Sequence, residues 1–217
     1  MRRLTSADVW RIAYAAFPKW LPKSQHSRLA KNLRGFFARR FIEHGGVNIN
    51  IERGATFGSE LSIGDNSGVG INCEVLGPCH IGNDVMMGPE VVIYTRNHSH
   101  SDPSKPMRLQ GYEEAFPVTI CDDVWLGRRV MIMPGVTIGK GTVVAAGAIV
   151  TKDLPEYAIC AGIPAKVVGN RSLERHPYAD PLIDAFKVPS RGNGHIPLLP
   201  QLRNIEKNLS CDWKLHR

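Results

Sequence analysis

The sequence has little of what marks several common classes of protein. Its five cysteines form no Cys-x-x-Cys pair, which excludes the usual zinc and thioredoxin-like spacings. It contains no apolar run long enough to span a membrane and no Gly-x-Ser-x-Gly nucleophile motif. The net charge is +7, yet no nucleic-acid-binding motif accompanies it. We therefore expect no nucleic-acid partner and, because no signal peptide is recognised, a cytoplasmic protein with reduced thiols.

What the chain does have is an apolar residue at every sixth position. A small or β-branched residue follows four positions after most of these, and Gly, Asn or Asp fill many places between. A period of six fits neither an α-helix nor a flat hairpin sheet, and it is typical of a parallel β-helix. The repeating residues are Ile51, Phe57, Ile63, Val69, Val75, Ile81, Met87 and Ile93, then Ile120, Leu126, Ile132, Ile138, Val144 and Val150.

Each hexad is expected to form a short strand followed by a tight corner, where a positive φ suits Gly, Asn and Asp. Three hexads close one triangular coil, so the fourteen hexads predict an all-β solenoid of four to five coils. Cys73 and Cys79 occupy inward positions of this repeat, and we interpret both as small buried apolar side chains.

The repeat is interrupted between Ile93 and Ile120, which are 27 residues apart rather than a multiple of six. The polar stretch 95–117 must therefore leave the coil as a loop, and it carries His98 and His100. Loops on rigid scaffolds often carry function, although a spacer loop with surface histidines fits the periodicity equally well.

Residues 1–46 precede the repeat domain of residues 47–170 and are expected to form a helical cap. Capping residues and apolar stripes predict helices over residues 5–17 and about 27–40. This segment holds ten Lys and Arg against two Asp and Glu, so it either touches an acidic surface or membrane or presents a solvated basic face. Residues 171–217 lose the periodicity and form an irregular C-terminal extension with no assigned role. The two apolar stripes comprise Val9, Ile12, Ala13, Ala16 and Phe17 in the first helix and Leu29, Leu33, Phe36, Phe37 and Phe41 in the second.

Several motifs resemble those of the hexapeptide-repeat acetyltransferases, above all the maltose and galactoside O-acetyltransferases and the sugar O-acetyltransferases of polysaccharide biosynthesis. The resemblance covers roughly residues 45–170. It implies a left-handed β-helix, a homotrimer with active sites between adjacent subunits, and acetyl-CoA as the donor, with no metal. Beside the hexads, the motifs are Thr95-Arg96-Asn97-His98, Val124-Trp125-Leu126-Gly127, Pro134-Gly135-Val136-Thr137-Ile138-Gly139, Ala146-Gly147-Ala148-Ile149-Val150-Thr151-Lys152-Asp153 and Gly162-Ile163-Pro164-Ala165-Lys166.

The resemblance implies transfer of an acetyl group to a hydroxyl of a sugar or polysaccharide precursor. The alcohol needs a base, and a neutral imidazole with a pKa near ~6.5 suits that task. His98 matches the family's catalytic histidine, so we predict that its Nε2 deprotonates the hydroxyl, which attacks the thioester directly. His100 is the competing candidate. We expect a backbone N–H near Gly127 to hold the oxyanion.

The resemblance also assigns residues to the acceptor and the donor. Asn72 and Trp125 match acceptor-side positions, with a corner asparagine and ordinary surface packing as the alternatives. Lys166 adds charge for phosphates, unless it is a solvated lysine at the end of the domain. Arg128 departs from the small polar residue that some relatives carry, which puts that contact in doubt. The residues expected to bind coenzyme A are Gly127, Arg128, Ala145, Ala146, Thr151, Lys152 and Lys166.

Other functions stay open on the sequence. An amine acceptor, as in N-acetylation of a nucleotide sugar, or an antibiotic acceptor would use the same donor. A zinc enzyme like the γ-type carbonic anhydrases would need three converging histidines, for which His80, His98 and His100 are the only set. A binding scaffold without catalysis fits the donor-side motifs poorly.

Overall fold

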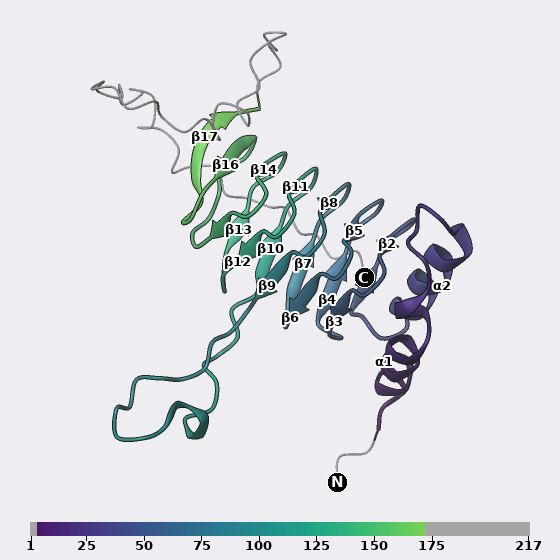
Figure 1. The fold of residues 1–217 in the computed structure, drawn as a ribbon, viewed down its shortest axis with the longest axis horizontal. Helices are drawn as coiled ribbons and strands as arrows, with labels where there is room; N and C mark the ends of the chain where they lie inside the picture. Colours follow the sequence, from purple (N-terminus) through teal and green to yellow (C-terminus); the bar gives the residue numbers. More distant parts are fainter. Residues whose placement is uncertain (1–3, 172–217) are drawn as a thin grey trace.

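The structure is a computed structural model that describes residues 4–171. It is a parallel β-helix whose short strands line three faces around one apolar core, with two helices at its first end (Figure 1). The predicted C-terminal extension lies outside the described residues, apart from Arg171.

The three sheets follow one another in turn around the coil. Sheet I contains β1 (His44–Gly45), β4 (Leu61–Ile63), β7 (Cys79–Ile81), β10 (Val118–Ile120) and β13 (Thr137–Ile138). Sheet II contains β8 (Met86–Met87), β11 (Trp125–Leu126), β14 (Val143–Val144), β16 (Ala158–Ala161) and the antiparallel β17 (Lys166–Asn170). A separate two-stranded sheet, β2 (Asn50–Ile51) with β5 (Gly68–Val69), precedes it on the same face of the coil, and we count this pair with sheet II. Sheet III contains β3 (Thr56–Phe57), β6 (Glu74–Leu76), β9 (Val92–Tyr94), β12 (Met131–Ile132) and β15 (Ile149–Val150).

Successive coils stack with a step of 18 residues, as three hexads require. Ile63 pairs with Ile81, and Ile120 pairs with Ile138. Across the interruption Ile81 pairs with Ile120, which is 39 residues further, so the loop adds 21 residues to one coil. The register before and after the loop is therefore the same, and the solenoid continues straight through it.

The predicted inward residues form the core. The fourteen apolar hexad residues are all buried except Met87, which is partly buried and packs against the others. The small or β-branched residues that follow four positions later are buried as well, among them Cys73 and Cys79. Burial raises the pKa of the Cys73 thiol to about 11. The solenoid has more than the predicted four to five coils. At its first end β1 pairs with β4 before the first hexad, and at its other end Leu154 pairs with Ile138. About six turns result.

The corners carry mostly Gly, Asn and Asp, as predicted, with Glu90 and Arg129 as exceptions. At two of the corners, residues with positive φ lie above one another, one in each coil. This conformation is one that Asn, Asp and Gly adopt more readily than other residues do. One row comprises Asn48, Asn66, Asp84, Asp123 and Gly141, and the other comprises Gly54, Asn72, Glu90, Arg129 and Gly147.

The N-terminal segment forms α1 (Ser6–Ala16), η1 (Pro18–Trp20) and α2 (Arg28–Ala38) over the open end of the first coil. Thr5 and Asp8 form a capping box at the start of α1, and Ser27 caps α2. The Tyr14 hydroxyl donates to Ala55 O at 3.0 Å from the buried side of α1. The helices thus satisfy backbone groups that an open coil end would leave unpaired.

The apolar stripe predicted for the first helix is not the face that packs on the coil. Val9, Ile12 and Phe17 are each more than half exposed, whereas Tyr14 is buried. The stripe predicted for the second helix is right in part: Phe41 is buried in the core and Phe37 packs against it, whereas Leu29 is 68% exposed. Arg34, which the stripe did not include, is buried on the face against the coil. The inward side of the two helices thus combines apolar packing with polar contacts to the backbone of the coil.

Arg34 is a fully buried cation at the centre of this cap. Its guanidinium donates to Ile51 O, Leu21 O, Pro22 O and Ser24 Oγ, and its Nη2 lies 3.7 Å from a Glu52 oxygen. One side chain therefore joins α2, the segment before it and the first coil.

We predict that Arg34→Met lowers the free energy of unfolding by roughly 3 kcal/mol, because it leaves the partners of a buried charge unpaired. Urea unfolding measures the loss. Arg28→Met, on the exposed side of the same helix, is the matched control and should change stability little. Equal losses for both variants would contradict the role given to Arg34.

Candidate functional site

The interrupting loop, residues 95–117, is a long arm that projects away from the body of the solenoid (Figure 1). Its base is a short antiparallel ladder, in which Phe116 N donates to Thr95 O at 2.7 Å and Glu113 N donates to Asn97 O at 2.9 Å. Thr95 is fully buried, and its hydroxyl donates to Leu76 O at 2.6 Å. The arm is therefore tied firmly to the wall at its root, and η2 (Met107–Leu109) lies in its outer part.

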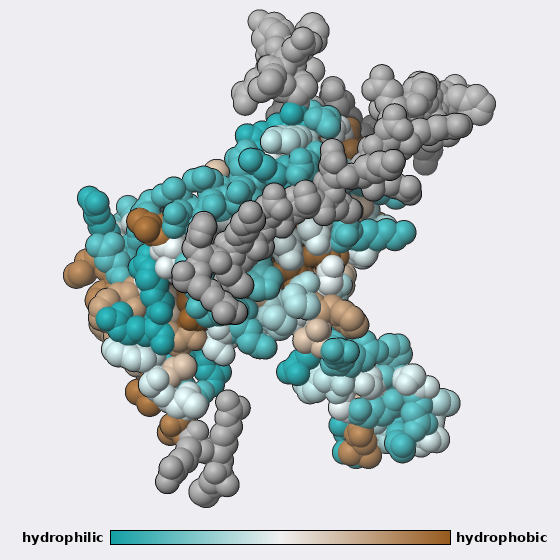
Figure 2. Space-filling view, turned by 180° about the vertical axis from the view of Figure 1, so that it is seen from behind, coloured by the Kyte–Doolittle hydropathy of each residue, from teal (hydrophilic) through white to brown (hydrophobic). Residues whose placement is uncertain are grey.

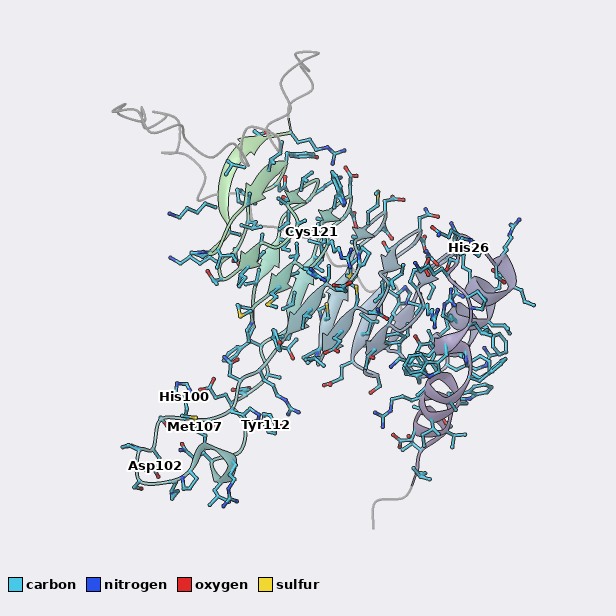
Figure 3. The ribbon with its side chains drawn as sticks, in the orientation of Figure 1. His26, His100, Asp102, Met107, Tyr112 and Cys121 are labelled. Carbon is cyan, nitrogen blue, oxygen red and sulfur yellow. The ribbon has the colours of Figure 1, made fainter. Side chains whose placement is uncertain are left out.

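His98 lies in this ladder, paired with Tyr112 across the arm. The two rings are 4.1 Å apart between centroids and tilted by 30°, and the Arg96 guanidinium lies 4.4 Å from the centre of the Tyr112 ring. Both His98 and Tyr112 are exposed. The imidazole is thus held on one side by an aromatic ring while it remains open to solvent. Tyr112 stands on the stem of the arm, with His100 on the opposite strand (Figure 3).

His100 has a different environment. Its Nδ1 is 3.2 Å from the backbone oxygen of His98 and 3.9 Å from a Glu113 carboxylate oxygen. This nitrogen is turned back toward the arm's own backbone.

The predicted site residues divide between two edges of the triangular coil. We call the corner between sheets II and III the donor edge; it comprises residues 52–55, 70–73, 88–91, 127–130 and 145–148. We call the corner between sheets III and I the arm edge; it comprises residues 58–60, 77–78, 95–117, 133–136 and 151–153. His98, Thr151 and Lys152 belong to the arm edge. On or beside the donor edge lie Asn72, Trp125, Gly127, Arg128, Ala145 and Ala146.

Gly127 has a structural role that the sequence left open. A Cβ built there would lie 2.5 Å from Ala146 N, so only glycine lets the next coil stack this closely. Its N–H donates to Val144 O at 2.8 Å in the ladder between coils. Because this N–H is already bonded, the backbone oxyanion donor predicted near Gly127 would be the amide of a neighbouring residue.

Arg128 and Arg129 are both bound to Glu90 in the coil below. Arg129 Nε donates to one Glu90 oxygen at 2.6 Å and Arg128 Nη2 donates to the other. The Arg128 hydrogen bond is the largest cause that holds the pKa of this carboxyl below its usual value. Arg128 is thus already occupied, and a phosphate would have to share it with Glu90.

Asn72 and Trp125 face outward near the donor edge. Asn72 has a positive φ and stacks over Gly54, where an added Cβ would lie 2.0 Å from the asparagine's Oδ1, so it does serve as a corner residue. Trp125 is 45% exposed on sheet II, with Met86 and Val143 beside it on the neighbouring strands. Next to them, Ala146 is exposed, and a Cβ added at Gly147 would meet nothing within 4 Å. This part of the wall is open.

Comparison with known proteins places the chain. The pattern "Bacterial transferase hexapeptide (six repeats)" matches residues 117–152. A maltose O-acetyltransferase from Clostridium difficile 630 has a TM-score of 0.65 and 30% identity, over 77% of this chain and 87% of that one. The chain belongs to the hexapeptide-repeat acetyltransferase family.

Further similarities agree with this assignment. A hexapeptide-repeat acetyltransferase from Vibrio cholerae O1 biovar eltor, solved in complex with acetyl coenzyme A, has a TM-score of 0.62 and 28% identity over 77% of this chain and 91% of that one. A putative acetyltransferase of Saccharomyces cerevisiae is 46% identical over 52% of this chain and 57% of its own length. The chain spans a little over half the length of the curated relatives it matches. Hexapeptide-repeat neighbours are left-handed β-helices, so the predicted fold class is confirmed.

The zinc alternative within the same architecture finds no support in the geometry. Among residues 4–171, no three His, Cys, Asp or Glu side chains are grouped closely enough to hold a metal ion. His80 lies in β7 on sheet I, between Ser62 and Thr119 of the neighbouring coils, and not in the arm with the other two histidines.

Two residues that contact predicted site residues of this acetyltransferase were not predicted from the sequence. Tyr112 contacts the predicted base, and Glu90 binds the arginine predicted to contact coenzyme A. Neither contact follows from spacing, because each joins residues in different strands or coils. Lys166, the remaining predicted donor residue, is exposed in β17 at the far end of sheet II.

We predict that Gly127→Ala destabilises the protein by roughly 2 kcal/mol, because the added methyl meets backbone atoms that cannot yield without opening the stack. Thermal unfolding of the variant measures the loss. The control is Gly58→Ala, at a corner where the nearest atom to an added Cβ is 4.0 Å away. If Gly127→Ala is as stable as the wild type, close stacking of the next coil does not require glycine at this position.

Proposed function

We propose that this protein is an acetyl-CoA-dependent O-acetyltransferase that acts on a hydroxyl of a sugar or saccharide, with His98 as the general base. The observation that carries the proposal is an exposed imidazole fixed on an arm, in a chain similar to a maltose O-acetyltransferase and to an acetyltransferase solved with acetyl coenzyme A. Polysaccharide biosynthesis in the cytoplasm is the setting that the sequence predicts.

The transfer needs no acyl-enzyme. His98 Nε2 takes the proton of the acceptor hydroxyl, and the oxygen attacks the thioester carbonyl carbon. The tetrahedral oxyanion then expels the coenzyme A thiolate, which takes the proton from the imidazolium. An O-acetyl ester and a free thiol are the products. Tyr112 supports this chemistry by limiting rotation of the ring without burying it.

The donor lies, on this proposal, along the open wall near Ala145 and Ala146. The absence of a side chain at Gly147 and the small residues before it leave room for the pantetheine arm beside the backbone. Thr151, Lys152 and Lys166 would meet the pantetheine and phosphate end, the lysines through charge. Trp125 and Asn72 would border the acceptor.

This assignment requires more than one copy of the chain. The donor edge and the arm edge are different corners of one triangular coil, so one protomer offers its base at one corner and its donor wall at another. Placing the arm edge of one copy against the donor edge of the next joins the two halves. Repeated three times around an axis, that contact closes into the predicted homotrimer.

We predict that His98→Ala lowers kcat by about 10²- to 10⁴-fold while the affinity for coenzyme A stays the same, because the base takes no part in holding the donor. Thiol release with a panel of sugar acceptors measures turnover, and calorimetry measures coenzyme A binding. His100→Ala is the matched control on the same strand of the arm. The assignment is wrong if His100→Ala, rather than His98→Ala, abolishes turnover.

A mixing experiment tests the shared site. His98→Ala removes the base, and Ala146→Trp blocks the donor wall, so each variant alone should be inactive. When the two variants are co-expressed, some contacts between subunits join the intact arm edge of one variant to the intact donor edge of the other. Random mixing should return about a quarter of the wild-type activity.

The same experiment can fail in an informative way. Mixed protein that is as inactive as the two parents, although it assembles, would place the whole site within one chain. Recovery of activity without any exchange of chains, monitored with two affinity tags, would contradict the proposal too.

A further inference from the structure

The strongest unexplained feature of the molecule is the apolar surface of its helical end. Here α1 and α2 leave large apolar side chains in solvent, although their opposite faces already pack on the first coil. Figure 2 shows several strongly hydrophobic residues at this end, set among hydrophilic ones. We call these residues the outer helical face; they are Val9, Ile12, Phe17, Trp20, Leu29 and Phe36, each at least 45% exposed.

A helix that is apolar on both sides needs a second partner besides its own core. The spacing of Val9, Ile12 and Ala16 puts them on one side of α1, away from Tyr14. The two helices are locked together by Trp10, whose ring meets Phe36 at 6.2 Å and Phe37 at 5.5 Å. The exposed side chains therefore belong to one rigid unit.

The segment that carries this face is strongly positive. Within residues 4–46, seven Lys and Arg side chains reach solvent, against the acidic Asp8 and Glu43. Two of the cations lie directly on the exposed aromatic rings: the Arg40 guanidinium is 3.2 Å from the Phe36 ring centre, and Lys19 Nζ is 5.0 Å from that of Trp20. Apolar anchors are thus interleaved with cations rather than separated from them.

We propose that the outer helical face docks on an anionic lipid surface. Apolar side chains would enter the boundary between headgroups and acyl chains, while the long cationic side chains reach the phosphates. A symmetric contact with a second copy would oppose two cationic faces, which disfavours that occupant. No helix in the described part of the chain is long and apolar enough to cross a bilayer, so the contact would be peripheral. This inference does not depend on the proposed acetyl transfer.

The test uses the full-length protein and large unilamellar vesicles. We expect the chain to sediment with vesicles of phosphatidylcholine that contain about 30% phosphatidylglycerol, and at least about tenfold less with phosphatidylcholine alone. Raising the salt from about 0.15 M to about 0.5 M should weaken the binding, because screening shortens the reach of the charges.

Matched variants locate the surface. The double variant Ile12→Gln with Phe36→Gln and the single variant Arg28→Glu should each weaken binding at least about tenfold. The controls are Ile163→Gln, which changes a residue 71% exposed near β17, and Lys140→Glu, an equal charge change on the coil. All of the altered side chains are exposed, and unchanged melting temperatures would confirm folding.

Three results would overturn the proposal. The first is wild-type protein that ignores the anionic vesicles. The second is binding that survives in both the glutamine double variant and Arg28→Glu. The third is a change of oligomeric state in the double variant without any vesicle binding by the wild type, which would assign the face to contacts between chains.

Discussion

Every feature of this protein depends on the stacking of one coil's backbone on the next, eighteen residues away. Because the amides and carbonyls of each short strand pair with the coils above and below, strands of two or three residues are stable that would not form alone. The inward apolar residues then form a continuous column. Corner residues, tight glycines and the root of the arm are all placed by this single repeat.

The repeat also explains why glycine and charge occur where they do at the corners. At Gly127 the next coil comes too close for any side chain, whereas at Gly147 the space beyond the corner is empty. Glu90 and Arg129 occupy corner positions with positive φ and are joined by a salt bridge between coils. Some residues of the donor edge thus hold the coils together, and the residues proposed to bind ligands there lie beside them.

The periodic part of the molecule could be predicted well because every coil obeys one local rule. Thirteen of the fourteen hexad residues are buried, and the positive-φ corners fall on Asn, Asp and Gly as expected, except at Glu90 and Arg129. The inner face of the cap could be predicted only in part: Phe41 is buried as expected, but a buried arginine bonded to four oxygens looks like any surface arginine in the sequence. The Tyr112 contact was hidden likewise: it joins residues at opposite ends of a loop whose fold has no period.

The arm has a consequence for how such a protein can diversify. Val118 pairs with Cys79 in the register that the chain would have without the loop. The stacking of the coils therefore does not depend on the number of residues in the loop. Lengthening, shortening or resurfacing the loop would therefore leave the pairing of the coils unchanged. Selection can thus change the length and surface of the loop almost independently of the residues that keep the coils stacked.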